Sequence, residues 1–193
     1  MSTIFDCSQD AERERGLALA IAVLKRGGLA AFAADSCYAL ACDAFDRSAV
    51  VEMLKAKGRD VRTPVSVLVP SITTMSGLVH QVSETMSAVA EQFWPGHVTI
   101  VARSARSLAW DLGDTGGTVS MRMPVTAPRS VADVVSGLGE ISELDVILDS
   151  GTITAQAPSS ILDLTDERPR LLREGLIAGD QLRTLLPDLE VLE

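Results

Sequence analysis

Three cations lie close together in the first third of the chain, at Lys57, Arg59 and Arg62. Arginine presents planar, bidentate donors and lysine a point charge, so the group could clamp the phosphates of a nucleotide. The same charges could equally lie on an exposed helix end, where cations complement the helix dipole. These residues alone leave both interpretations open.

A second group of polar side chains follows an expected buried strand, in the segment Ala34-Asp35-Ser36-Cys37-Tyr38. Small polar groups at the carboxyl end of a strand often line ligand sites in α/β proteins. A simple turn with a capping aspartate fits the same residues. This segment therefore indicates a ligand site only in combination with others.

Four later segments strengthen the case for a ligand site, because they follow the first two groups in a specific order. They are Phe93-Trp94-Pro95-Gly96, residues 118–124 with Arg122 before Pro124, residues 159–165, and Leu172-Arg173-Glu174-Gly175. Together with the two earlier groups, they resemble the motifs of the threonylcarbamoyl-AMP synthases. That YrdC-like family begins the synthesis of threonylcarbamoyladenosine in tRNA. The resemblance runs from about residue 10 to residue 178, and several short motifs in the family's order make chance similarity a poor explanation.

The resemblance implies a reaction with three substrates: threonine, bicarbonate and ATP. The amine of threonine takes up carbon dioxide to form a carbamate, whose oxygen attacks the α-phosphate of ATP as pyrophosphate leaves. Such chemistry depends mainly on positioning and charge neutralisation, and Mg²⁺ is expected to accompany ATP. Downstream tRNA-modification proteins are the expected partners.

The resemblance also implies roles for individual residues by their motif positions. Threonine would be bound by Ser36, Arg122 and Ser159, with Arg122 on its carboxylate. The nucleotide would be bound by Lys57, Arg59, Thr63, Thr118 and Arg173. The pocket wall would include Asp35, Tyr38, Leu68 and Ser160. No catalytic side chain and no protein ligand for a metal is assigned, and Trp94 and Pro95 are expected to pack rather than to bind ligand.

The sequence departs from the family pattern near the expected site. The first motif lacks its proline, its first threonine and its glycine, which is replaced by Ala39, and Leu68 stands where a histidine is common. A Ser-x-Asn tripeptide is also missing. Only residues 125–144 separate Pro124 from the next expected strand, whereas the family's strand and helix with their connections need roughly thirty residues. Two functions therefore remain open: an active or weakly active synthase, and an impaired or inactive paralogue that keeps a small-molecule pocket or binds a partner.

Composition narrows the class of protein. The 193 residues are 47% hydrophobic and 22% charged, enough to bury a substantial core. The net charge of −9 disfavours direct binding of nucleic acid, including double-stranded RNA. Three cysteines without framework spacing favour a reducing, cytoplasmic location, and the longest apolar run is too interrupted for a membrane span.

Hydrophobic patterning predicts a single α/β domain over residues 1–193, with flanking helices and a twisted mixed β-sheet. The resemblance implies that this is a YrdC-like domain with a concave ligand-binding face. On that face Lys57, Arg59, Arg122 and Arg173 are expected to converge. One amphipathic helix is expected over residues 10–26. Three further helices are expected to be capped by Asp46, Ser71 and Ser83, one to have Pro128 in its first turn, and a last one to be capped by Asp180. The expected strands are residues 29–33, 65–69, 98–102, 118–123, 146–148, 160–164 and 170–172.

Overall fold

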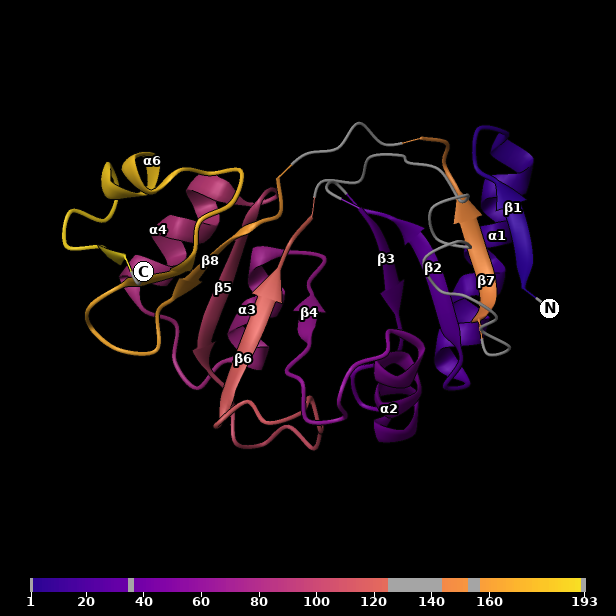
Figure 1. Cartoon of the computed structure of the whole chain (residues 1–193), viewed down its shortest axis with the longest axis horizontal. Coiled ribbons are helices and arrows are strands. Elements are labelled where there is room, and N and C mark those ends of the chain that lie inside the picture. Colours follow the sequence, from indigo (N-terminus) through magenta and orange to yellow (C-terminus); the bar gives the residue numbers. More distant parts are fainter. Residues whose placement is uncertain (1, 35–36, 125–143, 153–156, 192–193) are drawn as a thin grey trace. The chain divides into compact units, whose positions relative to one another are not determined.

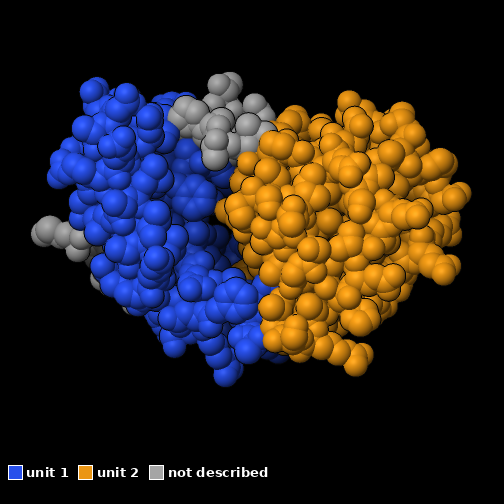
Figure 2. Space-filling view, turned by 180° about the vertical axis from the view of Figure 1, so that it is seen from behind, with its two compact units in different colours: residues 1–63, 109–113, 126–155 blue, residues 64–108, 114–125, 156–193 orange. Residues whose placement is uncertain are grey.

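The computed structural model describes residues 2–34, 37–124, 144–152 and 157–191 (Figure 1). The chain packs as two compact units, which Figure 2 shows in different colours. Unit 1 comprises residues 1–63, 109–113 and 126–155, and unit 2 comprises residues 64–108, 114–125 and 156–193. Each unit thus joins segments that are far apart in the sequence. The prediction of a single domain over the whole chain stays a prediction.

Unit 1 is built on a four-stranded mixed sheet in the order β1-β7-β2-β3. Its strands are β1 (Thr3–Asp6), β2 (Leu29–Ala33), β3 (Tyr38–Ala41) and β7 (Leu144–Asp149). Strands β1 and β2 run parallel to β7 on its two sides, and β3 runs antiparallel to β2. The carboxyl ends of the three parallel strands therefore share one edge, where β3 begins at Tyr38.

Helix α1 (Asp10–Lys25) lies on one face of this sheet (Figure 1). A Cβ atom at Gly16 would lie 2.8 Å from Leu148 and 2.9 Å from Phe5, so only glycine lets the helix approach this closely. Gly27 then adopts a φ of +81° and ends the helix, as predicted. The predicted amphipathic character is wrong, because Leu17 and Ile21 lie on the solvent side of the helix.

Helix α2 (Arg47–Ala56) begins and ends at the residues that the sequence indicated. The Asp46 carboxylate accepts hydrogen bonds from the backbone N–H groups of Ser48 and Ala49, at 2.9 and 3.1 Å. Lys57 is the C-cap residue. The helix therefore delivers Lys57 and Arg59 directly after its last turn.

Unit 2 is built on a six-stranded mixed sheet in the order β10-β9-β8-β5-β6-β4. Its strands are β4 (Ser66–Leu68), β5 (Val98–Arg103), β6 (Thr118–Arg122), β8 (Ser160–Asp163), β9 (Arg170–Arg173) and β10 (Glu190–Val191). The central strands carry side chains with no exposed surface, such as Ile100, Met121 and Leu162. The mixed α/β class is confirmed, and the strands form two sheets instead of the expected one.

Helices α3 (Ile72–Leu78), α4 (Glu84–Phe93) and α6 (Gly179–Arg183) complete unit 2. Ser71 and Ser83 cap α3 and α4 as predicted, each accepting from a backbone N–H group. The predicted cap at Asp180 is wrong, because Ala178 is the N-cap residue and Asp180 lies within the first turn. A carboxylate in the first turn still interacts favourably with the positive end of the helix dipole. This is why Asp180 marked the start of the helix in the sequence, although it is not the N-cap residue.

None of the helices in the described part of the chain is long and apolar enough to cross a bilayer. The helix predicted from Pro128 to Leu138 lies outside the described residues.

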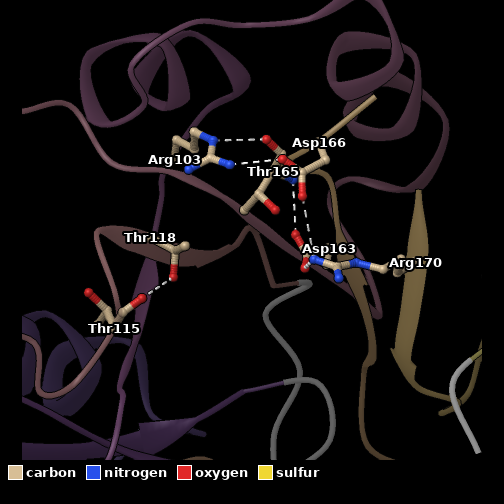
Figure 3. Close-up of polar contacts among 7 residues, drawn as sticks. All are labelled: Arg103, Thr115, Thr118, Asp163, Thr165, Asp166 and Arg170. Carbon is tan, nitrogen blue, oxygen red and sulfur yellow. Dashed lines mark hydrogen bonds and ion pairs between the residues drawn. The ribbon is translucent and has the colours of Figure 1, made fainter. Parts of the chain in front are cut away.

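An ion-pair network joins the strand ends at one edge of the unit 2 sheet (Figure 3). Buried Asp163 accepts from the Thr165 backbone N–H and pairs with Arg170. Arg170 also lies 3.8 Å from Asp166, which pairs with Arg103 at 2.8 Å. Burial by itself would raise the pKa of the Asp163 carboxyl, but the hydrogen bonds from Thr165 and Arg170 outweigh it and hold the pKa below the ordinary value of 3.8. The folded state therefore favours the charged form of Asp163.

This network predicts a pH-dependent contribution of Asp163 to stability. A carboxyl whose pKa is lower in the folded state stabilises the fold above its ordinary pKa of 3.8, and this contribution is lost as the pH falls through the lower folded value. Asp163→Asn is expected to lower the free energy of unfolding by about 1–3 kcal/mol at pH 7. The difference from the parent should shrink below about pH 4, as measured by urea unfolding. The matched control is Asp166→Asn, because the pair of Asp166 with Arg103 is exposed and contributes only about 0–1 kcal/mol. An equal loss of unfolding free energy in both variants would contradict the larger contribution assigned to Asp163.

Candidate functional site

Three of the predicted ligand-binding residues lie at the opposite edge of the unit 2 sheet. Strand register places them there, because Ile100 of β5 pairs with Met121 of β6 and Val98 pairs with Ser160 of β8. The carboxyl ends of β6 and β9 consequently meet the amino ends of β5 and β8. Arg122, Ser159 and Arg173, far apart in the sequence, therefore gather at one edge of one sheet.

Ser159 is the buried centre of this group, with 5% of its surface exposed. Its hydroxyl lies 2.8 Å from the Thr99 hydroxyl. Arg173 donates to the Ser159 carbonyl from Nε at 3.1 Å and from a terminal nitrogen at 2.7 Å. The same terminal nitrogen also lies 3.3 Å from the Ser159 hydroxyl oxygen. Two side chains thus orient one serine hydroxyl.

Arg122 is held by the turn that follows α4. Its Nε donates to the Gly96 carbonyl at 3.1 Å, and the Gly96 N–H donates to the Met123 carbonyl at 2.8 Å. Trp94 is buried and donates from Nε1 to the Val98 carbonyl at 2.7 Å. These contacts support a packing role for Trp94. Through the Gly96 carbonyl, the Trp94-Pro95-Gly96 turn positions the guanidinium group of Arg122.

Ser160 and Gly175 bring the Arg173 segment against the start of β8. The Ser160 hydroxyl donates to the Ile177 carbonyl at 2.6 Å and accepts from the Gly175 N–H at 3.0 Å. A Cβ at Gly175 would collide with the backbone of Pro158 and Ser159. The motif glycine is therefore required by a close backbone approach that sets the distance between Arg173 and Ser159.

Two further predicted residues lie on the neighbouring strands of unit 2. Leu68 pairs with Arg122 at the same edge and has 40% of its surface exposed. Thr118 begins β6, about 13 Å from Arg122 at roughly 3.3 Å per residue. Its hydroxyl donates to the Thr115 carbonyl at 2.7 Å (Figure 3). The structure therefore brings Leu68, but not Thr118, next to Arg122.

Unit 1 carries Lys57 and Arg59, two of the three cations predicted for the nucleotide, directly after α2. Lys57 is exposed, yet desolvation of its ammonium and then repulsion from Arg59 lower the pKa of Lys57. Solvent screening keeps such an effect small for an exposed group. The backbone of Thr63 lies against Gly113, where a Cβ atom would be 2.7 Å from the Thr63 carbonyl oxygen. The predicted convergence of these cations with Arg122 and Arg173 stays a prediction.

Tyr38 lies at the carboxyl edge of the unit 1 sheet. Its hydroxyl accepts from the Ser150 N–H at 3.0 Å and lies 3.2 Å from both Asp149 Oδ1 and the Gly151 carbonyl. Chiefly through burial, the pKa of Tyr38 is raised to about 12. The phenol is thus protonated at neutral pH, which suits a pocket wall better than a proton carrier.

Two predicted residues, Asp35 and Ser36, lie outside the described residues, as does the segment 125–143 that follows Pro124. Sequence reasoning missed Thr99, and it named Gly96 only as part of a motif, without a role. A threonine between Val98 and Ile100 in an otherwise apolar strand is the signal that could have revealed a buried hydroxyl with a partner.

Known proteins resemble this chain over nearly its whole length. Residues 22–131 match the profile of the Sua5/YciO/YrdC family, whose description reads "Telomere recombination". A putative threonylcarbamoyl-AMP synthase from Mycobacterium leprae is 38% identical over 208 residues, which cover 96% of this chain and 94% of that protein. The chain belongs to the Sua5/YciO/YrdC family.

Solved structures of Sua5/YciO/YrdC proteins share the fold. A variant of Pyrococcus abyssi Sua5 matches with a TM-score of 0.87 at 22% identity, covering 100% of this chain and 62% of that one. P. abyssi Sua5 complexed with L-threonine matches with a TM-score of 0.81 at 24% identity, covering 90% and 58%. The chain therefore spans about three fifths of the length of these archaeal proteins. Escherichia coli YciO, at 20% identity and a TM-score of 0.74, is covered over 97% of its length.

The M. leprae protein also has residues that this Sua5/YciO/YrdC member lacks. The 208 aligned positions exceed the 193 residues of the chain, so the M. leprae protein carries residues that have no counterpart here. The profile match ends at residue 131, within the segment 125–143. No asparagine occurs anywhere in the sequence, so no Ser-x-Asn tripeptide is present in another position.

Proposed function

We propose that this chain is a slow threonylcarbamoyl-AMP synthase that binds threonine between Arg122 and Ser159. The observation that carries the proposal is the gathering of Arg122, Ser159 and Arg173 at one edge of the unit 2 sheet. Relatives named threonylcarbamoyl-AMP synthase and the threonine complex of a protein with the same fold support it.

Threonine offers a carboxylate, an amine and a hydroxyl, and the described edge offers groups complementary to two of them. The planar guanidinium of Arg122 suits a carboxylate, with which it forms charge-assisted hydrogen bonds. The Ser159 hydroxyl suits the threonine hydroxyl or carboxylate as a neutral donor. Because Arg173 and Thr99 both contact the Ser159 oxygen, that hydroxyl is oriented before ligand arrives. Such preorganisation lowers the entropic cost of binding.

The nucleotide phosphates are assigned to Lys57 and Arg59, the two cations that follow α2 directly in unit 1. Their charges would neutralise phosphate oxygens, and Mg²⁺ is expected to arrive with ATP. The described residues contain no group of three or more His, Cys, Asp or Glu that could hold a metal ion. In the reaction, the carbamate oxygen of carboxylated threonine forms a bond to the α-phosphorus as the bond to pyrophosphate breaks. The protein contributes alignment and charge, with no side chain assigned as acid or base.

The product would pass to downstream tRNA-modification proteins in the cytoplasm. The chain itself is not expected to bind the tRNA, because its net charge of −9 opposes contact with phosphates.

A second candidate is a non-catalytic paralogue that keeps the threonine pocket. It is favoured by the residues that the M. leprae protein has and this chain lacks, and by the lost proline, threonine and glycine of the first motif. Both candidates bind threonine, but only the synthase releases pyrophosphate when threonine, bicarbonate and ATP are all present. Calorimetry with threonine tests the pocket, and pyrophosphate release separates the two candidates. Tight binding of ATP with no binding of threonine would contradict both.

Thr99 provides a test of how the pocket is oriented. Thr99→Val removes the partner of the Ser159 hydroxyl and nearly preserves the volume of the side chain. The affinity for threonine is expected to fall about 5- to 10-fold, the value of one neutral hydrogen bond. Calorimetry measures this, and Thr99→Ser should restore most of the affinity because it restores the hydroxyl. Unchanged affinity in the valine variant would show that Thr99 does not orient Ser159 for ligand.

A further inference from the structure

The outward face of α1 is apolar, although no other element of the described structure covers it. Leu17 and Ile21 have 46% and 54% of their surface exposed, and Ala18 and Ala22 are exposed beside them. The inward face of the same helix buries Gly16, Ala20 and Val23 against the sheet. A helix that is apolar on both sides is normally covered on both sides.

The four outward residues form a compact patch, called here the α1 face. Positions 17 and 21, and positions 18 and 22, are one helical turn apart and stack in two adjacent rows. Glu14 lies one turn before Leu17 and Lys25 one turn after Ile21, both exposed. Other charges of α1 are neutralised within unit 1, by the pairs Arg13–Asp10 and Arg15–Glu12. Among the described residues, Glu14 and Lys25 form no ion pair, so the face ends in one unmatched charge of each sign.

We propose that the α1 face binds the α1 face of a second copy of this chain, as an antiparallel helix pair around a twofold axis. If the twofold axis passes midway between positions 19 and 20, residue i of one copy faces residue 39 − i of the other. Leu17 then faces Ala22 of the second copy, Ile21 faces Ala18, and Glu14 faces Lys25. A symmetric pair makes every one of these contacts twice.

This register satisfies packing and charge together. A large side chain meets a small one at each apolar contact, which lets the helix axes approach to about 8–10 Å. Both unmatched charges gain a partner of opposite sign at the two ends of the pair. A parallel pair would instead place Leu17 on Leu17 and Glu14 on Glu14, which packs poorly and repels. The antiparallel second copy is therefore the occupant that this face fits.

The expected dimer is weak. A helix of 16 residues is about 24 Å long, and one face of it offers less than the roughly 800 Å² per partner of a standard interface. A dissociation constant on the order of 10–100 µM is expected. No residue of the α1 face belongs to the proposed threonine site, so threonine affinity should be the same in monomer and dimer.

Sedimentation equilibrium of the full chain between about 5 and 500 µM tests the proposal. The parent is expected to dimerise over this range, and Ile21→Glu is expected to weaken dimerisation at least 10-fold while leaving the circular dichroism spectrum unchanged. The matched control is Ile4→Glu, which changes a residue of equal type and similar exposure, 51%, on β1. It should dimerise as the parent does.

A charge exchange tests the register itself. Glu14→Lys and Lys25→Glu should each dimerise at least 10-fold more weakly than the parent, because each symmetric pair then opposes two like charges. An equimolar mixture of the two variants should dimerise about as well as the parent, since both contacts of the mixed pair regain opposite charges. A parent that stays monomeric at 500 µM would overturn the proposal, as would a dimer indifferent to Ile21→Glu. A mixture that fails to recover dimerisation would overturn the antiparallel register.

Discussion

Pyrophosphate release by the unmodified 193-residue chain is expected to be at least about 10³-fold slower than release by a longer relative, such as the Mycobacterium tuberculosis protein that is 37% identical. The reason is the missing Ser-x-Asn tripeptide, which the family resemblance places at a nucleotide-binding turn. Loss of one positioned donor costs about 10²–10³ in rate, and a misplacement of about 1 Å costs about 10² more. Lys57 and Arg59 can still neutralise phosphate, but neutralisation without alignment leaves the carbamate and the α-phosphate poorly placed.

The measurement is pyrophosphate release with threonine, bicarbonate and ATP, compared with reactions that omit one substrate. Grafting the relative's segment after Pro124 should raise the rate if the remaining pocket is sound. Arg59→Ala in the grafted protein should abolish the gain, because a phosphate contact would then be missing. Release at the relative's rate by the unmodified chain would show that the missing segment is dispensable.

Arg122→Ala is expected to weaken threonine binding by about 100-fold or more. Removing one partner of a desolvated charge pair costs roughly 2–5 kcal/mol, because the carboxylate loses its donor and keeps its desolvation cost. The loss should be larger than for Thr99→Val, where a neutral hydrogen bond is removed and the ligand keeps its ion pair. Calorimetry with threonine at a constant pH measures both variants.

Arg103→Ala is the matched control for Arg122→Ala. Both are arginines at strand ends of the unit 2 sheet, but Arg103 lies at the other edge, where it pairs with Asp166. Its removal should leave threonine affinity unchanged. Arg122→Lys should recover only part of the affinity, because lysine cannot donate to the Gly96 carbonyl and to a carboxylate in the planar geometry of a guanidinium group. Equal losses at Arg103 and Arg122 would indicate that a general charge effect, and not a specific pocket, holds threonine.

The sequence by itself determined the local elements. Helices α2, α3 and α4 begin after Asp46, Ser71 and Ser83, because each side chain accepts hydrogen bonds from backbone N–H groups that a helix leaves unpaired. Gly27 ends α1 because its positive φ is easily adopted only without a side chain. These signals act within a few residues, so they can be read without knowing the rest of the fold. The order of the motifs was equally visible, and it was sufficient to indicate the family.

Only the tertiary structure decided how these elements combine. Strand β1 was not predicted, and it pairs with β7 across more than a hundred residues, Thr3 with Val146. The division of the strands into two sheets has the same origin. Strand order is set by which apolar faces pack together, and no short stretch of sequence records that choice.

In the candidate site, too, the sequence indicated the residues and only the tertiary structure decided how they meet. The resemblance named Arg122, Ser159 and Arg173, but their meeting at one sheet edge follows from the register of β5 with β6 and β8. Thr99 became visible only when β5 placed its hydroxyl 2.8 Å from that of Ser159. Likewise, the periodicity of α1 could not show that Leu17 and Ile21 lie outward, because Gly16 sets which side of the helix meets the sheet. Composition and spacing specify which secondary structure a segment can form. Its neighbours in space decide which of its side chains are buried and which remain available to bind.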